Sequence, residues 1–181
     1  MELSDTGGQV VGAERSTFFY IYAMKLKFLL LCFSLMALGV ANAAAVTGQH
    51  GEVLTASKTV GIAAGQTIIV SGKKFDTGVG IYVEMCKVVP AGILPNTCGG
   101  GANLSGTGAA SFWISSNPPS YGKNLALSFK PHGSFSVGLK VQPMIGKIDC
   151  RTVQCAIYVR ADHTRTQDRT HDIKLPITFK K

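Results

Sequence analysis

The apolar positions of the chain follow two patterns, each in its own part of the sequence. Residues 28–40 form an almost continuous apolar run, whereas from residue 65 onward short apolar stretches alternate with polar residues between Gly, Pro, Asn and Ser. Period-two alternation between turn-forming residues is typical of half-buried β-strands. No stretch shows a sustained helical period with capping residues. The pattern predicts a short apolar segment followed by an all-β domain.

The alternation is clearest in Ser134–Val141, where every second residue from Phe135 onward is apolar. Pro176 lies within the last expected strand and cannot donate a ladder hydrogen bond, so this strand is expected at a sheet edge or with a bulge. About seven short strands with turn signals between them predict a two-sheet sandwich. The other expected strands are Thr67–Ser71, Gly80–Cys86, Ala109–Ile114, Cys155–Arg160 and Ile173–Phe179.

The apolar run is part of a segment with the composition of a secretory signal peptide, residues 24–43. A short basic stretch precedes the run, and small residues that fit an A-x-A cleavage site follow it, with cleavage expected after Ala43 or Ala45. A membrane anchor is the alternative, although the run is shorter than the roughly 20 residues that span a bilayer. Residues 1–23 precede this scheme, and we expect the chain to start at Met24. The mature domain, residues 44–181, is expected to be secreted or at the cell surface.

The chain has five cysteines, an odd number for an exported domain. Cleavage of the signal peptide removes Cys32 and leaves an even number, which in an oxidising compartment predicts two disulfides. We expect local pairs, while two other pairings remain possible. Zinc binding by these thiols is disfavoured because neither pair has C-x₂-C spacing. The remaining cysteines are Cys86, Cys98, Cys150 and Cys155.

The composition adds a basic balance, with 18 Lys and Arg against 10 Asp and Glu and a net charge of +8. The hydrophobic fraction of 46% excludes wholesale disorder. Net positive charge favours anionic partners such as nucleic acid, anionic lipids or cell-wall polymers. The lysines are dispersed, however, which is more typical of a charge that maintains solubility. We expect at most weak, non-specific binding of nucleic acid, because no recognition helix or RNA-binding signature is present.

Catalytic motifs are missing from the sequence. It contains no G-x-S-x-G, H-E-x-x-H or P-loop motif, so we do not expect an enzyme. The segment Asp162–Asp172 holds two His and three Asp residues that could ligate Zn²⁺ or Ca²⁺. Interleaved arginines offset these carboxylates, so a salt-bridged loop is the expected structure. We assign no metal ligands and no resident cofactor from the sequence.

Two parts of the sequence resemble the neocarzinostatin family. The first is Gly65–Gly72 with Phe75 and Gly80–Cys86, and the second is Gly146–Ile157, in which an Asp precedes a cysteine pair with a four-residue gap. The resemblance extends over residues 52–180. It implies a seven-stranded immunoglobulin-like β-sandwich with disulfides Cys86–Cys98 and Cys150–Cys155.

The resemblance also implies a function. Members of the family are secreted actinobacterial apoproteins that hold an enediyne chromophore without a covalent bond, in a cleft beside the sandwich. The released chromophore cleaves DNA, and the family is associated with DNA binding and antimicrobial (antibiotic) activity. The sequence departs from the family in its basic charge, in its charged loop near the C-terminus, and at Val88, where the family has an aromatic residue.

We therefore expect a monomeric carrier of a small hydrophobic ligand, with a ligand-free cell-surface module that binds anionic envelope components as the alternative. In the simpler interpretation of the cleft, Ile93 and Leu94 only pack their loop, and Phe135 only packs the core. The expected cleft residues are Val88, Ile93, Leu94, Phe129, Phe135, His163 and Arg165.

Overall fold

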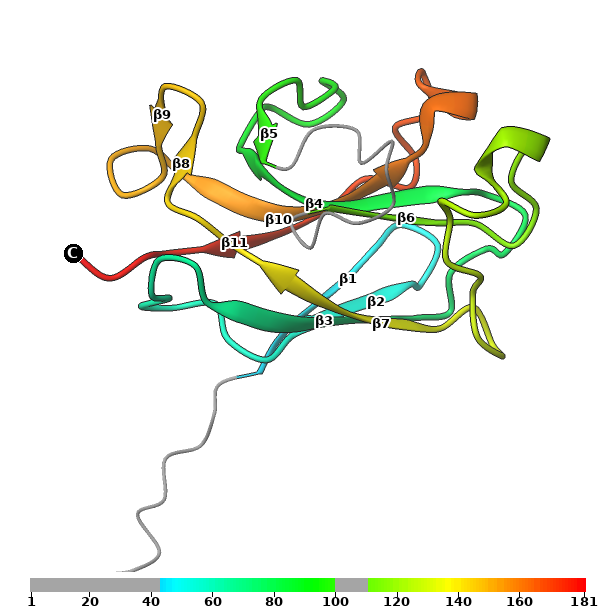
Figure 1. Ribbon diagram of the computed structural model, residues 1–181, viewed down its shortest axis with the longest axis horizontal. Helices are drawn as coiled ribbons and strands as arrows, with labels where there is room; N and C mark the ends of the chain where they lie inside the picture. Colours follow the sequence, from blue (N-terminus) through cyan, green and yellow to red (C-terminus); the bar gives the residue numbers. More distant parts are fainter. Residues whose placement is uncertain (1–42, 100–110) are drawn as a thin grey trace, which may run out of the picture. The chain divides into compact units, whose positions relative to one another are not determined.

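The computed structural model describes residues 43–99 and 111–181, which fold as two antiparallel β-sheets packed face to face (Figure 1). The first sheet has four strands in the spatial order β1-β2-β3-β7. Its strands are β1 (Ala44–Thr47), β2 (Val53–Ala56), β3 (Thr67–Lys73) and β7 (Phe135–Lys140).

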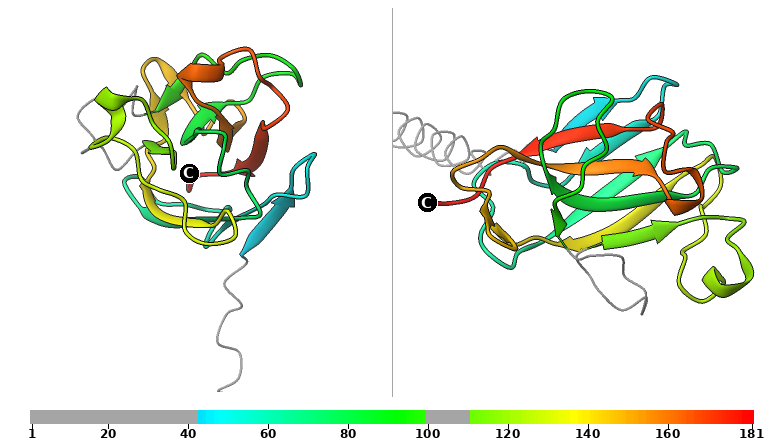
Figure 2. Two further views of the ribbon diagram at one scale, coloured as in Figure 1. Left: turned by 90° about the vertical axis from the view of Figure 1, so that its right-hand side faces the viewer. Right: turned by 90° about the horizontal axis from the view of Figure 1, so that it is seen from above.

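The second sheet has five strands, in the order β11-β10-β4-β5 with β6 also paired to β4. Strands β5 and β6 share one edge of β4, β6 along its first half and β5 at Met85 and Cys86. The two sheets form separate layers when the molecule is turned about its vertical axis (Figure 2). The strands are β4 (Ile81–Lys87), β5 (Cys98–Gly99), β6 (Ser111–Ile114), β10 (Cys155–Ala161) and β11 (Ile173–Ile177).

Three short elements complete the described fold. A hairpin of β8 (Met144–Ile145) and β9 (Ile148–Asp149) precedes β10. Two single 3₁₀ turns, η1 (Ser120–Gly122) and η2 (His163–Arg165), lie in the connections after β6 and β10. No α-helix occurs within the described ranges.

The hydrophobic core lies between the two sheets and follows from the alternation along the strands. In β3 and β7 every second side chain is buried, and Ile68 and Leu139 are both 0% exposed. The facing sheet contributes Val83, Met85 and Ile157 to the same cluster. Burial of these apolar side chains is the main stabilising contribution of such a sandwich.

The all-β sandwich predicted from the sequence is confirmed, as are both local disulfides, Cys86–Cys98 and Cys150–Cys155. Pro176 lies on β11, which pairs only with β10 among the described strands, so its expected place at a sheet edge is also confirmed.

Strands β1 and β2 were not predicted. Each has only four residues, too few to show a clear alternation. Two sequence expectations lie outside the described residues: the signal segment up to residue 42, and the first two residues of the strand expected from Ala109.

Candidate ligand-binding site

The outer face of the five-stranded sheet carries polar and aromatic side chains in place of the aliphatic residues of the core face. Because successive side chains of a strand point to opposite faces, the even-numbered residues of β4 and β10 lie on this outer face. Tyr82 pairs with Arg160 and Glu84 with Tyr158 across the two strands. On the other side of β4, Tyr82 pairs with Trp113.

The Cys86–Cys98 loop is fixed to one part of this face. Cys86 packs with Tyr158 in a small buried cluster that also includes Ala156, Val88 and Cys98. The backbone N–H of Val89 donates a 3.1 Å hydrogen bond to the Tyr158 hydroxyl. The ammonium group of Lys174 on β11 donates a 2.9 Å hydrogen bond to the Val89 carbonyl. The loop is thereby tied to both β10 and β11.

A small hollow of about 70 Å³ lies between this loop and the sheet. Ile93 and Pro90 line it from the loop, and Tyr158 and Lys174 line it from the strands. Ile93 is 55% exposed, so an apolar side chain remains accessible at the rim of the hollow.

An ion pair occupies the centre of the outer face. Arg160 Nε donates a 2.7 Å hydrogen bond to Glu84 Oε1, and Glu84 is 4% exposed. Burial raises the pKa of Glu84, and the attraction of Arg160 opposes that rise. The guanidinium carbon of Arg160 also lies 4.9 Å from the centre of the Tyr82 ring, within the range of a cation–π contact.

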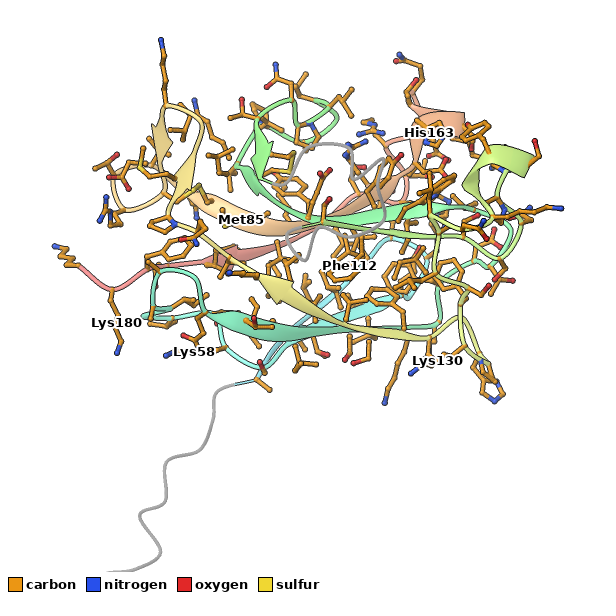
Figure 3. The ribbon with its side chains drawn as sticks, in the orientation of Figure 1. Lys58, Met85, Phe112, Lys130, His163 and Lys180 are labelled. Atoms are coloured by element: carbon orange, nitrogen blue, oxygen red, sulfur yellow. A yellow bond between two sulfur atoms is a disulfide. The ribbon has the colours of Figure 1, made fainter. Side chains whose placement is uncertain are left out.

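Four rings gather where η1 and η2 approach the sheet, and we call Tyr82, Trp113, Tyr121 and His163 the aromatic cluster. His163 is at its centre: its Nδ1 lies 2.5 Å from the Tyr82 hydroxyl and its Nε2 lies 2.6 Å from the Tyr121 hydroxyl. The Trp113 and His163 ring centres are 4.9 Å apart in an edge-on arrangement. Figure 3 shows His163 at this end of the molecule.

A buried hydrogen bond holds the aromatic cluster in place. The indole N–H of Trp113 donates a 2.8 Å hydrogen bond to the buried carboxylate of Asp162. Burial, with a smaller contribution from Asp162, raises the pKa of Tyr82 to about 12, so this hydroxyl keeps its proton at physiological pH. Tyr121, in contrast, is 63% exposed, so the cluster presents an open aromatic surface on a fixed base.

The residues expected for the cleft fall in three separate places. Val88, Ile93 and Leu94 lie in the Cys86–Cys98 loop, Val88 packed inward and the other two exposed. His163 belongs to the aromatic cluster, and Arg165 is exposed at the end of η2. The two phenylalanines lie elsewhere: Phe135 is 5% exposed in the core between the sheets, and the partly buried Phe129 packs against that core.

Several residues of the outer face were not singled out from the sequence. Tyr82, Glu84 and Tyr158 lie on strands that were predicted correctly, and their position opposite the core residues could have been inferred from the alternation. Tyr121 follows a Pro-Pro pair in an irregular connection, where no periodic signal exists.

The charged loop after β10 contains local hydrogen bonds. Asp162 accepts hydrogen bonds from the Thr164 backbone N–H and hydroxyl, at 2.9 and 2.6 Å. Arg169 forms an ion pair of 3.2 Å with Asp172.

Within the described residues, no helix is long and apolar enough to cross a membrane.

The fold and this site define a disulfide-bonded β-sandwich with an aromatic cluster on the outer face of one sheet. No family model matches the chain, and no curated protein matches it either. Among solved structures the chain is similar to macromomycin, with 19% sequence identity and a TM-score of 0.47, over 71% of this chain and 99% of that chain. Macromomycin is a member of the neocarzinostatin family, the family that the sequence resembles. At this TM-score and identity the likeness assigns neither a function nor functional residues to the chain.

Proposed function

We propose that the protein is a secreted, non-enzymatic carrier that holds a small hydrophobic ligand on the outer face of the five-stranded sheet. The observation that carries the proposal is the aromatic cluster, in which Tyr121 is 63% exposed while Trp113 is 8% exposed and anchored. Ligand sites combine apolar and aromatic surface with a few well-placed polar groups. The Glu84–Arg160 pair and the His163 ring are polar groups of this kind.

The site is organised before any ligand arrives. Both ring nitrogens of His163 have hydroxyl partners, and the Cys86–Cys98 disulfide with the Lys174 contact restrains the neighbouring loop. A preorganised site loses less conformational entropy on binding, which favours affinity. The exposed ring surface suits a planar or polyunsaturated ligand, because aromatic faces stack on π-systems.

The more specific form of the proposal follows from the resemblance to the neocarzinostatin family. In that form the ligand is an enediyne-type antibiotic, and any association with DNA or antimicrobial activity comes from the released ligand. Secretion is supported by the two disulfides, since such bonds persist in oxidising compartments.

The test begins with protein purified from its own host. We expect absorbance in the near ultraviolet or visible range that organic solvent extracts. The extracted compound is then titrated into the apoprotein, with fluorescence of the single tryptophan, Trp113, as the signal. Tyr121→Ala should weaken binding roughly 2- to 10-fold, the range of one aromatic contact.

Ile69→Ala is the matched control, because Ile69 is 49% exposed on β3 of the opposite sheet. The affinity of this variant for the extracted compound should equal that of the unmodified protein. A featureless apoprotein spectrum, together with salt-sensitive binding to anionic liposomes, would contradict the carrier proposal and support a surface module instead.

A further inference from the structure

A second group of chemically active side chains lies away from the aromatic cluster. His50 and Glu52 come from the turn between β1 and β2, and His171 comes from the loop before β11. One ligand atom from each of the three residues can be chosen so that all lie within 4.8 Å of one another. The view from above in Figure 2 shows this turn (cyan) and this loop (red) at the same end of the sandwich.

Glu52 is the central member of the group and is 1% exposed. Its Oε2 accepts a 2.9 Å hydrogen bond from the backbone N–H of His50. Its Oε1 lies 3.4 Å from Nδ1 of His171. A buried carboxylate requires strong partners, and a charge-assisted hydrogen bond would bring these two atoms to about 2.7–2.9 Å.

The observed separation of 3.4 Å between Glu52 Oε1 and His171 Nδ1 matches the spacing of two ligand atoms on one metal ion. In a tetrahedral zinc site with Zn–N and Zn–O bonds of about 2.0–2.1 Å, two ligand atoms lie roughly 3.4 Å apart. The Oε1 atom of Glu52 and the Nδ1 atom of His171 are therefore spaced as two ligands of one ion. The ring of His50, whose centre is 5.2 Å from that of His171, is close enough to supply a third ligand.

The surroundings of His171 fit the same interpretation. Its other nitrogen, Nε2, lies 3.8 Å from Oδ2 of Asp168. Histidines that bind metals commonly direct their second ring nitrogen toward a carboxylate, which fixes the tautomer. Asp168 is itself held by the Thr170 backbone N–H at 2.9 Å and by the Thr170 hydroxyl at 2.6 Å.

The group opens into a pocket of about 440 Å³. Asp76 and Lys74 also line this pocket, so its lining carries two carboxylates, Glu52 and Asp76, against one ammonium group. This balance favours a cation. The pocket also leaves space at a fourth coordination position for a water molecule, as in zinc sites with three protein ligands.

We propose that His50, Glu52 and His171 form a binding site for Zn²⁺ with one open coordination position. Two imidazoles and one carboxylate suit zinc and neighbouring transition metals, whereas Ca²⁺ and Mg²⁺ require oxygen ligands. The site would join the β1–β2 turn to the loop before β11. It extends the sequence analysis, which assigned no metal, and it does not depend on the proposed carrier function.

The test uses the secreted, disulfide-bonded protein after metal removal. We expect calorimetry to detect one Zn²⁺ per chain and Co²⁺ to give a visible spectrum of nitrogen and oxygen ligation. A thiolate band should be absent, because the four cysteines of the described residues are in disulfides. Ca²⁺ and Mg²⁺ should not bind.

Variants assign the ligands. His171→Ala and Glu52→Gln should each weaken Zn²⁺ binding at least 10-fold. His50→Ala is an additional variant that should preserve the fold, because the side chain is exposed and the hydrogen bond to Glu52 comes from the backbone N–H. His132→Asn is the control: this exposed residue has φ of 61°, a conformation that Asn tolerates, and its removal should leave binding unchanged.

Thermal unfolding of each metal-free variant shows whether it folds, and added Zn²⁺ should raise the midpoint only where the three ligands are intact. Two results would overturn the proposal. One is the absence of Zn²⁺ binding to the unmodified protein at millimolar metal. The other is equal binding by His50→Ala and the unmodified protein, which would place the metal at other surface groups.

Discussion

Trp113 and Asp162 are joined by a 2.8 Å hydrogen bond from the indole Nε1 to the carboxylate Oδ2, and both residues are buried. The bond connects β6 with the segment that leads into η2, two parts of the chain separated by 49 positions. It fixes the base of the aromatic cluster, because His163 follows Asp162 directly and contacts the Trp113 ring at its edge.

Replacement of Asp162 tests the importance of this bond. Asp162→Ala should lower the free energy of unfolding by about 1–3 kcal/mol, because the buried indole N–H loses its acceptor. Asp162→Asn retains an acceptor oxygen and should cost less. Urea unfolding followed by Trp113 fluorescence measures both. Equal stability of Asp162→Ala and the unmodified protein would show that water replaces the carboxylate.

Gly133 tests a close approach between two loops. Its φ is 59°, and a Cβ atom at this position would collide with the backbone carbonyl of Phe75. Gly146 has a similar φ of 57°, but a Cβ atom added there would meet nothing within 4 Å. Gly146→Ala should therefore cost only the left-handed backbone penalty of about 1–2 kcal/mol.

Gly133→Ala should lower the free energy of unfolding clearly more than Gly146→Ala does, since the backbone of one loop must move. Chemical denaturation of the two variants under identical conditions gives the comparison. A similar loss in both would mean that the Phe75 loop yields without strain.

The buried pair of Glu84 and Arg160 predicts a pH dependence of stability. Burial raises the pKa of Glu84 above its ordinary value of 4.5, so the unfolded chain releases this proton at a lower pH than the folded chain does. The contribution of Glu84 to stability is complete below that ordinary value and is lost as the pH rises through the folded-state pKa.

The substitution Glu84→Gln should remove this loss of stability with rising pH. Urea unfolding at a series of pH values from acidic to neutral, with the unmodified protein as reference, isolates the difference. A pH profile that the substitution leaves unchanged would show that Arg160 fully compensates the burial of the carboxylate.

The two disulfides should affect ligand binding unequally. Cys86 and Cys98 pack with Val88 and Tyr158 beside the proposed site, whereas Cys150 and Cys155 lie in the core between the sheets. Serine replacement of the first pair should therefore weaken binding of the extracted ligand more than replacement of the second pair. Fluorescence titration measures the affinities, and equal values after either change would contradict the proposed site.

The processed N-terminus is a further prediction. Intact mass spectrometry of the secreted protein should give a chain that is four hydrogens lighter than its reduced form. We expect the chain to start at Ala44 rather than at Val46, because β1 begins at Ala44 and pairs it with Ala56. Free thiols in the secreted protein would contradict the disulfide assignment.

The β-sandwich could be predicted from the amino-acid sequence. Alternation along strands such as Phe135–Lys140 reports which side chains face the core, and this is a local property of the chain. The edge position of Pro176 was also predictable, because proline lacks the N–H that a central strand requires. Both disulfides close short loops, so their pairing agreed with sequence proximity.

The meeting of distant residues, in contrast, depends on three-dimensional packing. The alternation places Phe135 on one face of its strand but does not tell whether that face borders the core or a cleft. The packing of the two sheets places Phe135 in the core. Tyr121 reaches His163 through a connection without periodicity. Glu52 and His171 are 119 positions apart, and the spacing of residues along the chain does not record such a contact. Local pattern determines which face a side chain occupies, whereas a binding site depends on how loops from different strands converge in space.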